Sequence, residues 1–578
     1  MPPPTTEHQR TAPTPAPVPR TSSPATSDRL RRPSTGRRGV LPRSSGRPAR
    51  LVAQLPAEQR PRLPFASALA VAALAGLIYS AAFPGTDIWP LAFVGLGLLL
   101  VTLRDRSPLA GALVGLVFGF TFWFSLIDWV ALFLGPLPLI ALGGLQALLV
   151  AAGCSLTATV YRAALRLWTS PSSRIILTPA LVAATWATRE VVAGTWPYGG
   201  FAWGRFAFSQ TTSPFAPLIS WVGNIGTGAL LVAVTAAAVA VLLEPRNRLL
   251  PRRPADLPVR LVAAAAPAML LTCVPLYALP YTGTLRVAAV QPNSNAGYFD
   301  PDNDPTRNLD IVTAATLPAI GRDVDLVVWP EGAAQYDPLQ DTPARSRLDQ
   351  VSRAAAAPIL TGAITTRGTR TYNSSVLWEP DRGVTAVYDK VRPVPFGEYV
   401  PDRAFWTTLA PTLLAQIGRD YTIGTRSPVL ELDDIRIAVN ICFDVVDDGL
   451  LLGAAAEDPQ VLIGQTNNAD FGRTDENQQQ LAIARTRALE TGRAFINTST
   501  VASTAVIDPA GQTLTATHPF TMQTLIADVP LVSGTTPATT LGTTGATALS
   551  VLGVLLPLLL STLTRSSPRT PTTRQRKP

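Results

Sequence analysis

Long apolar stretches, separated by short polar connections, fill most of the first half of the chain and return near its end. Eight of them approach the roughly 20 residues that a helix needs to cross about 30 Å of hydrocarbon. They lie at Leu63–Phe83, Ile88–Leu103, Leu109–Leu134, Leu137–Leu165, Ile175–Ala193, Phe215–Leu243, Leu261–Leu279 and Leu541–Leu563. The pattern predicts eight transmembrane helices, seven within residues 63–279 and the eighth at 541–563. The second stretch is short and the fourth is long, and a re-entrant segment in place of either would move every later connection to the other side.

A different pattern fills residues 281–536, where the apolar runs are short and bounded by Gly, Pro, Asp and Asn. Runs of this kind predict strands at Leu285–Val290, Val324–Trp329, Pro358–Ile364, Ser375–Trp378, Ile435–Ile441 and Val461–Gly464. Helical periodicity predicts helices at Arg307–Ile320, Ser346–Ala356 and Asn477–Glu490. Strands that alternate with helices in this way indicate one layered α/β domain.

Charge gives the predicted helices a direction. Basic residues cluster in alternate connections, which lie on one side of the membrane if every stretch crosses it once. Because cytoplasmic connections carry the excess of Lys and Arg, we predict both termini in the cytoplasm and the α/β domain on the outer face. Residues 286–528 hold 30 of the 39 acidic side chains and 19 of the 48 basic ones, so the α/β domain is acidic.

The basic excess therefore lies in the tails and the cytoplasmic connections. Residues 1–62 are rich in Pro, Arg, Ser and Thr, which predicts a disordered basic cytoplasmic tail, and residues 564–578 form a second basic tail. Orientation and anionic lipid explain basic segments beside membrane spans, so we expect no nucleic-acid partner.

Three reactive side chains follow apolar runs of the α/β domain. Glu331 comes directly after a predicted strand, Lys390 follows the run at 384–388, and Cys442 follows the strand Ile435–Ile441. Ligands gather at the carboxyl ends of strands in such sheets. Taken singly, the three are a turn carboxylate, a surface charge and a small buried hydrophobe. Together they supply the base, the cation for a developing oxyanion and the nucleophile that acyl transfer through a thioester requires.

The other reactive side chains narrow the chemistry. The histidines are His8, in the N-terminal tail, and His518, so a Cys-His protease would have to use His518. Cys154 and Cys273 fall in apolar stretches, and the three cysteines have neither metal-ligand spacing nor a disulfide framework. We predict no metal and no cofactor.

The three motifs, 59 and 52 residues apart, resemble the Glu-Lys-Cys triad of the nitrilase or carbon–nitrogen hydrolase superfamily. This resemblance implies an αββα sandwich for residues 281–536. The block at 390–401, the Tyr372-Asn373-Ser374 motif and the flanking apolar stretches resemble the membrane-bound N-acyltransferases of that superfamily. Such enzymes take an acyl chain from a membrane phospholipid and transfer it to the N-terminal amine of a diacylglyceryl-cysteine apolipoprotein, in the bacterial cell membrane.

The resemblance also implies roles for single residues. Glu331 would take the thiol proton of Cys442, the thiolate would form the acyl thioester, and Lys390 would stabilise the oxyanion. Glu398 matches a functional position that holds Lys390 or stabilises the intermediate, although a surface loop charge is the alternative. Asn373 is expected to support this group.

The chain departs from the family pattern at several positions around this site. Phe443 and Asp444 stand where the family often has Tyr-Glu, and Gln480 stands where a His is common. Phe299 matches the aromatic residue expected after the first strand. These changes concern the substrate more than the chemistry, because the triad is complete.

Aromatic residues crowd the connection at 194–213, and an interfacial aromatic belt is their ordinary explanation. The sharper hypothesis is that Trp203 guides acyl chains. Two other functions stay open: a membrane-anchored amidase or nitrilase with water as the acceptor, and a transporter or lipid-binding protein with an inactive outer domain. We expect the protein to act as a monomer.

Overall fold

The computed structural model describes residues 63–566, apart from 169, 244–256, 295 and 299–301. The predicted tail at 1–62, all but the first three residues of the tail at 564–578, and Phe299 therefore lie outside the described residues.

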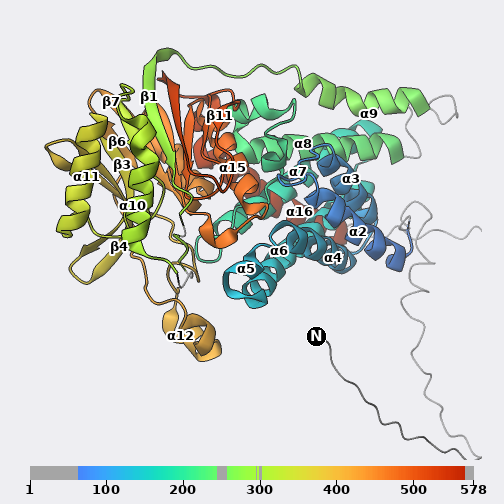
Figure 1. The fold of residues 1–578 in the computed structure, drawn as a ribbon. Helices are drawn as coiled ribbons and strands as arrows, with labels where there is room; N and C mark the ends of the chain where they lie inside the picture. Colours follow the sequence, from blue (N-terminus) through green and yellow to red (C-terminus); the bar gives the residue numbers. More distant parts are fainter. Residues whose placement is uncertain (1–62, 169, 244–256, 295, 299–301, 567–578) are drawn as a thin grey trace, which may run out of the picture. The chain divides into compact units, whose positions relative to one another are not determined.

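Apolar helices form the first region of the chain and return at its end (Figure 1). Their bounds are Phe65–Ser80 (α2), Leu91–Leu103 (α3), Pro108–Leu126 (α4), Val130–Leu134 (α5), Pro136–Leu167 (α6), Pro171–Thr195 (α7), Ile219–Leu243 (α8), Leu257–Leu271 (α9) and Pro537–Ser566 (α16). Within the part of the chain that the structure describes, five helical segments are long and apolar enough to cross a membrane: Pro108–Leu126, Pro136–Leu167, Ser172–Thr195, Ala216–Leu243 and Pro537–Thr564.

Each of the eight predicted stretches contains a helix, but three of these helices are short. The helices α2, α3 and α9 have 16, 13 and 15 residues, fewer than the roughly 20 that a span needs. The helices thus support a membrane region, and the count of eight spans stays a prediction.

Glycines spaced four residues apart let α4 pack closely on α6. A Cβ atom at Gly115 would lie 2.5 Å from the Cβ of Cys154, and one at Gly111 would lie 2.7 Å from the Cβ of Ala158. Small residues at this spacing are typical of helix pairs in membranes, where close backbone approach replaces the hydrophobic effect as the source of stability.

The α/β domain contains two six-stranded sheets. The first has the strand order β12-β1-β2-β3-β4-β5, with bounds Gln523–Val532, Tyr281–Gln291, Leu326–Val328, Ile359–Arg367, Arg370–Glu379 and Gly383–Asp389. The second has the order β11-β10-β9-β8-β7-β6, with bounds Thr513–Ala516, Ala505–Ile507, Phe495–Ser499, Val461–Thr466, Ile435–Ile441 and Val429–Leu432. Strands occur at all six predicted positions, and β7 has the predicted bounds.

Alternation along the strands builds two separate cores. Val287 and Ala289 of β1 pack in a core shared by both sheets, together with Val439 of β7. The alternate residues Ala288 and Val290 face the opposite way and pack in a second core. Successive side chains of a strand point to opposite faces, so β1 serves both layers at once.

Helices cover the outer face of each sheet. The helices α10 (Pro305–Thr316) and α11 (Thr342–Ala355) contribute to the second core, against the first sheet. Beside the other sheet lie α14 (Asp448–Ala456) and α15 (Glu476–Thr491), and Ala484 of α15 shares a core with Phe495 of the sheet and with side chains of the apolar helices. The predicted αββα sandwich is confirmed.

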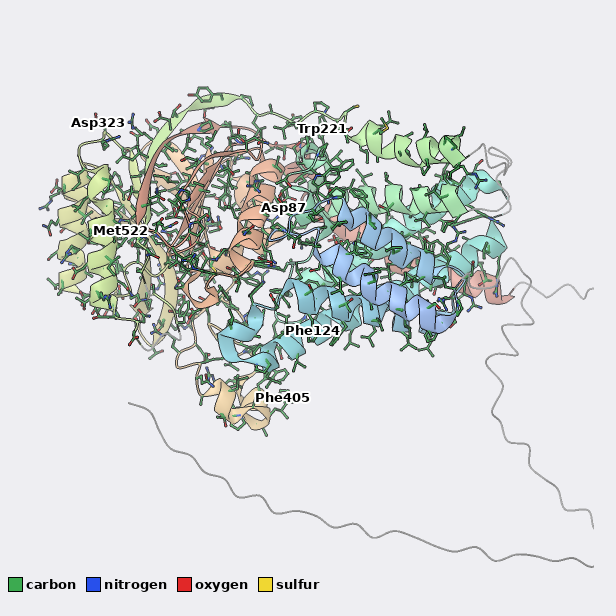
Figure 2. All side chains as sticks on the ribbon, turned by 45° about the vertical axis from the view of Figure 1, so that its right-hand side comes forward. Asp87, Phe124, Trp221, Asp323, Phe405 and Met522 are labelled. Carbon is green, nitrogen blue, oxygen red and sulfur yellow. The ribbon has the colours of Figure 1, made fainter. Side chains whose placement is uncertain are left out.

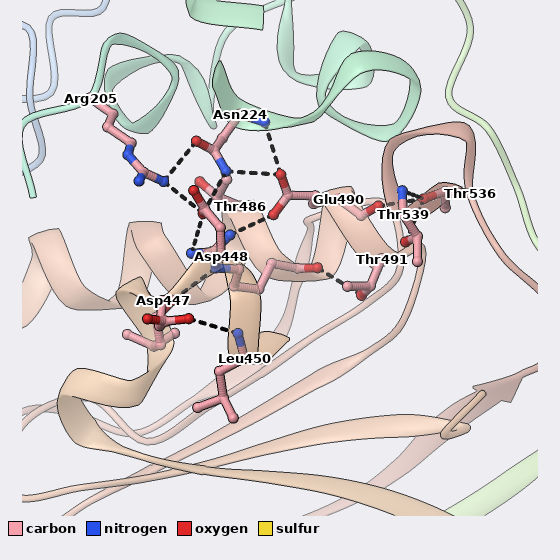
Figure 3. A network of polar contacts seen from close by, with 12 residues as sticks. Arg205, Asn224, Asp447, Asp448, Leu450, Thr486, Glu490, Thr491, Thr536 and Thr539 are labelled. Atoms are coloured by element: carbon pink, nitrogen blue, oxygen red, sulfur yellow. Dashed lines mark hydrogen bonds and ion pairs between the residues drawn. The ribbon is translucent and has the colours of Figure 1, made fainter. Parts of the chain in front are cut away.

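A buried polar network joins this sandwich to the apolar helices (Figure 3). The guanidinium of Arg487 on α15 bridges Asp448 and Glu490, at 2.9 and 2.6 Å. On the side of the apolar helices, Arg205 lies 2.7 Å from Asp448, and Asn224 donates to Glu490 at 2.9 Å. Arg487 and Glu490 share α15, whereas Asp448, Arg205 and Asn224 come from elements far from it in sequence, so the network links the two regions.

A short helical segment lies apart from the sheets, formed by α12 (Arg403–Leu409) and α13 (Pro411–Leu414). Figure 2 labels Phe405 on it, and this side chain is 59% exposed. Tyr198, in the connection that follows α7, contacts this segment. Its hydroxyl donates to Asp402 at 2.9 Å and accepts from Trp406 at 3.1 Å.

Candidate active site

A tight turn places Cys442 at the carboxyl end of β7. Cys442 has a φ of 47°, in the left-handed region that few non-glycine residues adopt. Asp444 holds this turn, because its carboxylate accepts hydrogen bonds from the backbone N–H of Ile441 at 3.0 Å and of Arg392 at 2.7 Å. The hydroxyl of Tyr388 donates to the same carboxylate at 2.8 Å. Asp444 is fully buried, and it supports the site by holding the backbone at Ile441 and Arg392 in place.

Glu331 and Lys390 meet beside this turn, although 59 residues separate them. Lys390 Nζ lies 3.1 Å from Glu331 Oε1 and 2.8 Å from Glu398 Oε2. All three side chains are at most 4% exposed, so Glu398 is not a surface charge. Gly362 of β3 allows Glu331 to come this close, because a Cβ atom there would lie 2.6 Å from the Glu331 Cα.

Asn373, in the middle of β4, connects the two carboxylates. Its amide Nδ2 lies 2.7 Å from Glu331 Oε1 and 3.0 Å from Glu398 Oε1. Tyr298 completes the cluster, since its hydroxyl accepts from Asn373 Nδ2 at 3.1 Å and donates toward both carboxylates at 3.3 to 3.4 Å. Sequence reasoning missed Tyr298 and selected its neighbour Phe299, which lies outside the described residues.

Burial and mutual charge set the protonation of this cluster. Burial alone would lower the pKa of Lys390, but Glu331 and Glu398 outweigh it and hold that pKa well above its usual value. Burial raises the pKa of Glu331 despite the opposing charge of Lys390. Burial, reinforced by Glu331, raises the pKa of the Cys442 thiol, and Lys390 acts against this shift. These shifts favour the protonated thiol for Cys442, in a site that also holds the cation of Lys390 and the carboxyl of Glu331, a group of the kind that takes protons in acid–base catalysis.

The cluster opens into a cavity of about 700 Å³. Polar groups of the site, Cys442, Glu331 and Lys390 among them, line one part of it. Most of the remaining wall is apolar and comes from α6, from the connection after α7 and from α12 and α13: Leu137, Ala141, Leu142, Leu145, Phe201, Trp406, Leu409 and Leu413. Pockets of this size and character accommodate apolar ligands and orient them through a few polar groups.

Phe443 and Trp203 both lie in the wall of this cavity. The ring of Phe201 stacks on Phe443 with centroids 6.1 Å apart and on Trp203 with centroids 5.7 Å apart. Trp203 is 4% exposed, and its indole N–H donates to Gln479 on α15 at 2.6 Å. A buried tryptophan fixed in this way is part of the cavity wall, so an aromatic belt is not its explanation.

A second group of polar residues approaches the thiol from α15. The amide of Gln480 donates to Cys442 Sγ at 3.5 Å. Asn468 Nδ2 lies 2.7 Å from Gln480 Oε1 and 2.9 Å from Glu476 Oε2. Glu476 also lines the cavity, and sequence reasoning missed this carboxyl because it begins a helix and follows no strand.

Both the region of apolar helices and the α/β domain are similar to known protein families. Residues 75–237 match the family model of the apolipoprotein N-acyltransferase N-terminal domain, and residues 286–536 match that of the carbon–nitrogen hydrolases. Apolipoprotein N-acyltransferase of Azotobacter vinelandii is 32% identical, over 81% of this chain and 90% of that protein. The enzyme of the same name from Pseudomonas putida is 31% identical, over 78% of this chain and 88% of that protein. The relative from Mycolicibacterium smegmatis is 28% identical, over 81% and 80%. With two regions matched in order and this identity along most of its length, the chain belongs to the apolipoprotein N-acyltransferase family.

Proposed function

We propose that the protein acylates the N-terminal amine of diacylglyceryl-modified apolipoproteins, with an acyl chain taken from a membrane phospholipid. The observation that carries the proposal is the joint lining of one cavity. Its reactive part holds Cys442, Glu331 and Lys390, and its apolar part comes largely from α6 and from α12 and α13. A thiol at the end of an apolar cavity suits an ester whose acyl chain must lie next to the nucleophile.

The first half-reaction forms a thioester. Glu331 takes the proton from Cys442 Sγ, and the thiolate attacks the ester carbonyl of the phospholipid. Lys390 stabilises the tetrahedral oxyanion, an interaction whose loss costs roughly 3 kcal/mol in related chemistry. The ester C–O bond then breaks, and Glu331 returns the proton to the lysophospholipid oxygen.

The second half-reaction forms the amide. The acceptor nitrogen attacks the thioester carbonyl, the C–S bond breaks, and Glu331 transfers a proton from the nitrogen to the Cys442 thiolate. Glu398 and Asn373 position Lys390 and Glu331 through the contacts described above. The alternation of basic connections supports eight spans and an outer position for the α/β domain. Glu331, Lys390 and Glu398 contact one another within one chain, which supports a monomer.

A membrane-embedded enzyme suits these substrates, because both are held in the bilayer by acyl chains. Extraction into water costs about 0.8 kcal/mol for each methylene group. A cavity that begins among apolar helices avoids that cost.

The test is acyl labelling in mixed detergent micelles. Purified protein receives a phospholipid with a labelled acyl chain, and we expect a hydroxylamine-sensitive label on Cys442 that a diacylated lipopeptide then discharges to its own amine. Cys442→Ala should carry no label, whereas Cys273→Ala, a matched control at an exposed thiol, should be labelled as the unaltered chain is. Folded protein that takes no label yet releases ammonia from small amides would make it an anchored amidase instead.

A further inference from the structure

Glu476 is a buried carboxyl in the wall of the active-site cavity. Its side chain begins α15 and is only 2% exposed. It lines the cavity together with Cys442, Gln480 and Glu331. The half-reactions above use Glu331, Lys390 and Cys442, and they leave Glu476 without a role.

The position of this carboxyl is fixed relative to the thiol. Asn468 Nδ2 lies 2.9 Å from Glu476 Oε2 and 2.7 Å from Gln480 Oε1, and Gln480 in turn donates to Cys442 Sγ. Asn468 is itself held at Oδ1 by the hydroxyls of Thr466 at 2.9 Å and Ser499 at 2.6 Å. Two amides thus hold Glu476 and the nucleophile in one rigid group.

Charge distinguishes Glu476 from the other carboxylates of the cavity. Glu331 and Glu398 share the cation of Lys390, whereas among the described residues no Lys or Arg offsets the charge of Glu476. Burial and the neighbouring charge of Glu331 raise the pKa of Glu476 to about 8. A buried carboxylate without a cation is costly unless a ligand supplies the opposite charge.

The acceptor of the proposed function carries such a charge, because an α-amino group has a pKa of about 7.7 to 8.0 and arrives mostly as an ammonium ion at neutral pH. The phospholipid donor presents no cation at its reacting ester. A carboxyl beside the thioester therefore has a use in the second half-reaction and none in the first.

We propose that Glu476 is the acceptor-specificity residue: its carboxylate binds the α-ammonium group of the lipoprotein beside the Cys442 thioester and accepts one proton from it. This inference rests on the proposed function. The freed nitrogen lone pair attacks the acyl carbon, and the second proton passes through Glu331 to the thiolate as the C–S bond breaks. Because a pKa of about 8 leaves Glu476 mostly protonated before the acceptor arrives, its original proton is lost to water as the ammonium group binds. The proton that Glu476 then accepts from the ammonium restores its starting state.

The test compares Glu476→Gln, which keeps the shape and removes the charge, with Glu431→Gln at an exposed position of β6. Loading of Cys442 from phospholipid should be unchanged in Glu431→Gln, and the loading of Glu476→Gln is measured separately so that its discharge is expressed per loaded enzyme. In Glu476→Gln the half-saturating concentration of diacylated lipopeptide should rise by roughly 10-fold or more, as expected for loss of a charged hydrogen bond. Discharge of the thioester by hydroxylamine, which needs no ammonium site, should match the unaltered chain.

A second measurement uses the unaltered chain, in case Glu476→Gln does not fold. A lipopeptide with a hydroxyl in place of the α-amino group should compete at least roughly 10-fold more weakly than the amine. Equal competition by the hydroxyl and amino lipopeptides would overturn the inference. So would a Glu476→Gln thioester that lipopeptide discharges normally, or one whose discharge by hydroxylamine falls as much as its discharge by lipopeptide. In each of these cases the proposed function stands as long as phospholipid labels Cys442 of the unaltered chain. If the unaltered chain takes no label, the proposed function itself is refuted.

Discussion

Arg205 and Asp448 form an ion pair of 2.7 Å between the connection that follows α7 and the helix that follows the nucleophile turn. Arg487 shares Asp448 and also donates from Nε to the backbone carbonyl of Val445 at 2.8 Å. Burial alone would raise the pKa of Asp448, but the two guanidinium groups outweigh it and hold that pKa well below its usual value. The charge cluster therefore links the turn that carries Cys442 to the connection between the apolar helices α7 and α8.

We expect Asp448→Asn to destabilise the protein by about 3 to 5 kcal/mol, because it leaves two buried guanidinium groups without their shared anion. Thermal unfolding in detergent measures the effect. Asp434→Asn, at an exposed turn, is the matched control and should melt with the unaltered chain. Identical melting of the two variants would show that the cluster adds little stability.

Lys390→Met should reduce the rate of thioester formation by roughly 100-fold or more, because the oxyanion loses its cation and two buried carboxylates lose their partner. Single-turnover labelling with excess enzyme measures this step directly. Arg382→Met removes an exposed cation outside the cavity and should leave the rate unchanged. A Lys390→Met enzyme with a normal labelling rate would contradict the role of Lys390.

Ala141→Trp should narrow the apolar part of the cavity and slow labelling by long-chain phospholipids more than by short-chain ones. Ala141 lines the cavity on α6, and the added ring occupies volume that an extended chain requires. The control is Ala152→Trp, on the same helix and exposed outside that lining. An equal loss with every chain length would place the acyl chain elsewhere.

Glu476 also predicts a pH dependence of stability. Its pKa in the folded chain is about 8 and its ordinary value is 4.5, so the folded state binds the proton more tightly than the unfolded state. Stability contributed at this position is therefore present below about pH 4.5 and is lost as the pH rises through about 8. The melting temperature of the unaltered chain should fall relative to Glu476→Gln across this window, and parallel curves would contradict the assignment.

Sequence patterns predicted the elements whose signal is local. The strand Ile435–Ile441 has the bounds of β7 because its apolar run ends at the turn that carries Cys442. The apolar stretches contain the expected helices, while the lengths of α2, α3 and α9 leave the number of spans as a prediction. The strand β12 was not predicted, because it is defined by its long-range antiparallel pairing with β1 and not by a local pattern of polar and apolar residues.

The sequence by itself selected Glu331, Lys390 and Cys442 as the candidate triad, since their order and residue types indicate acyl transfer before any contact is known. Only the tertiary structure decided what surrounds it. Tyr298 and Glu476 belong to a loop and a helix start that carry no periodic signal, and they reach the site because the two sheets pack face to face. The cavity wall likewise combines α6 with the α/β domain, and such long-range packing is absent from any local pattern.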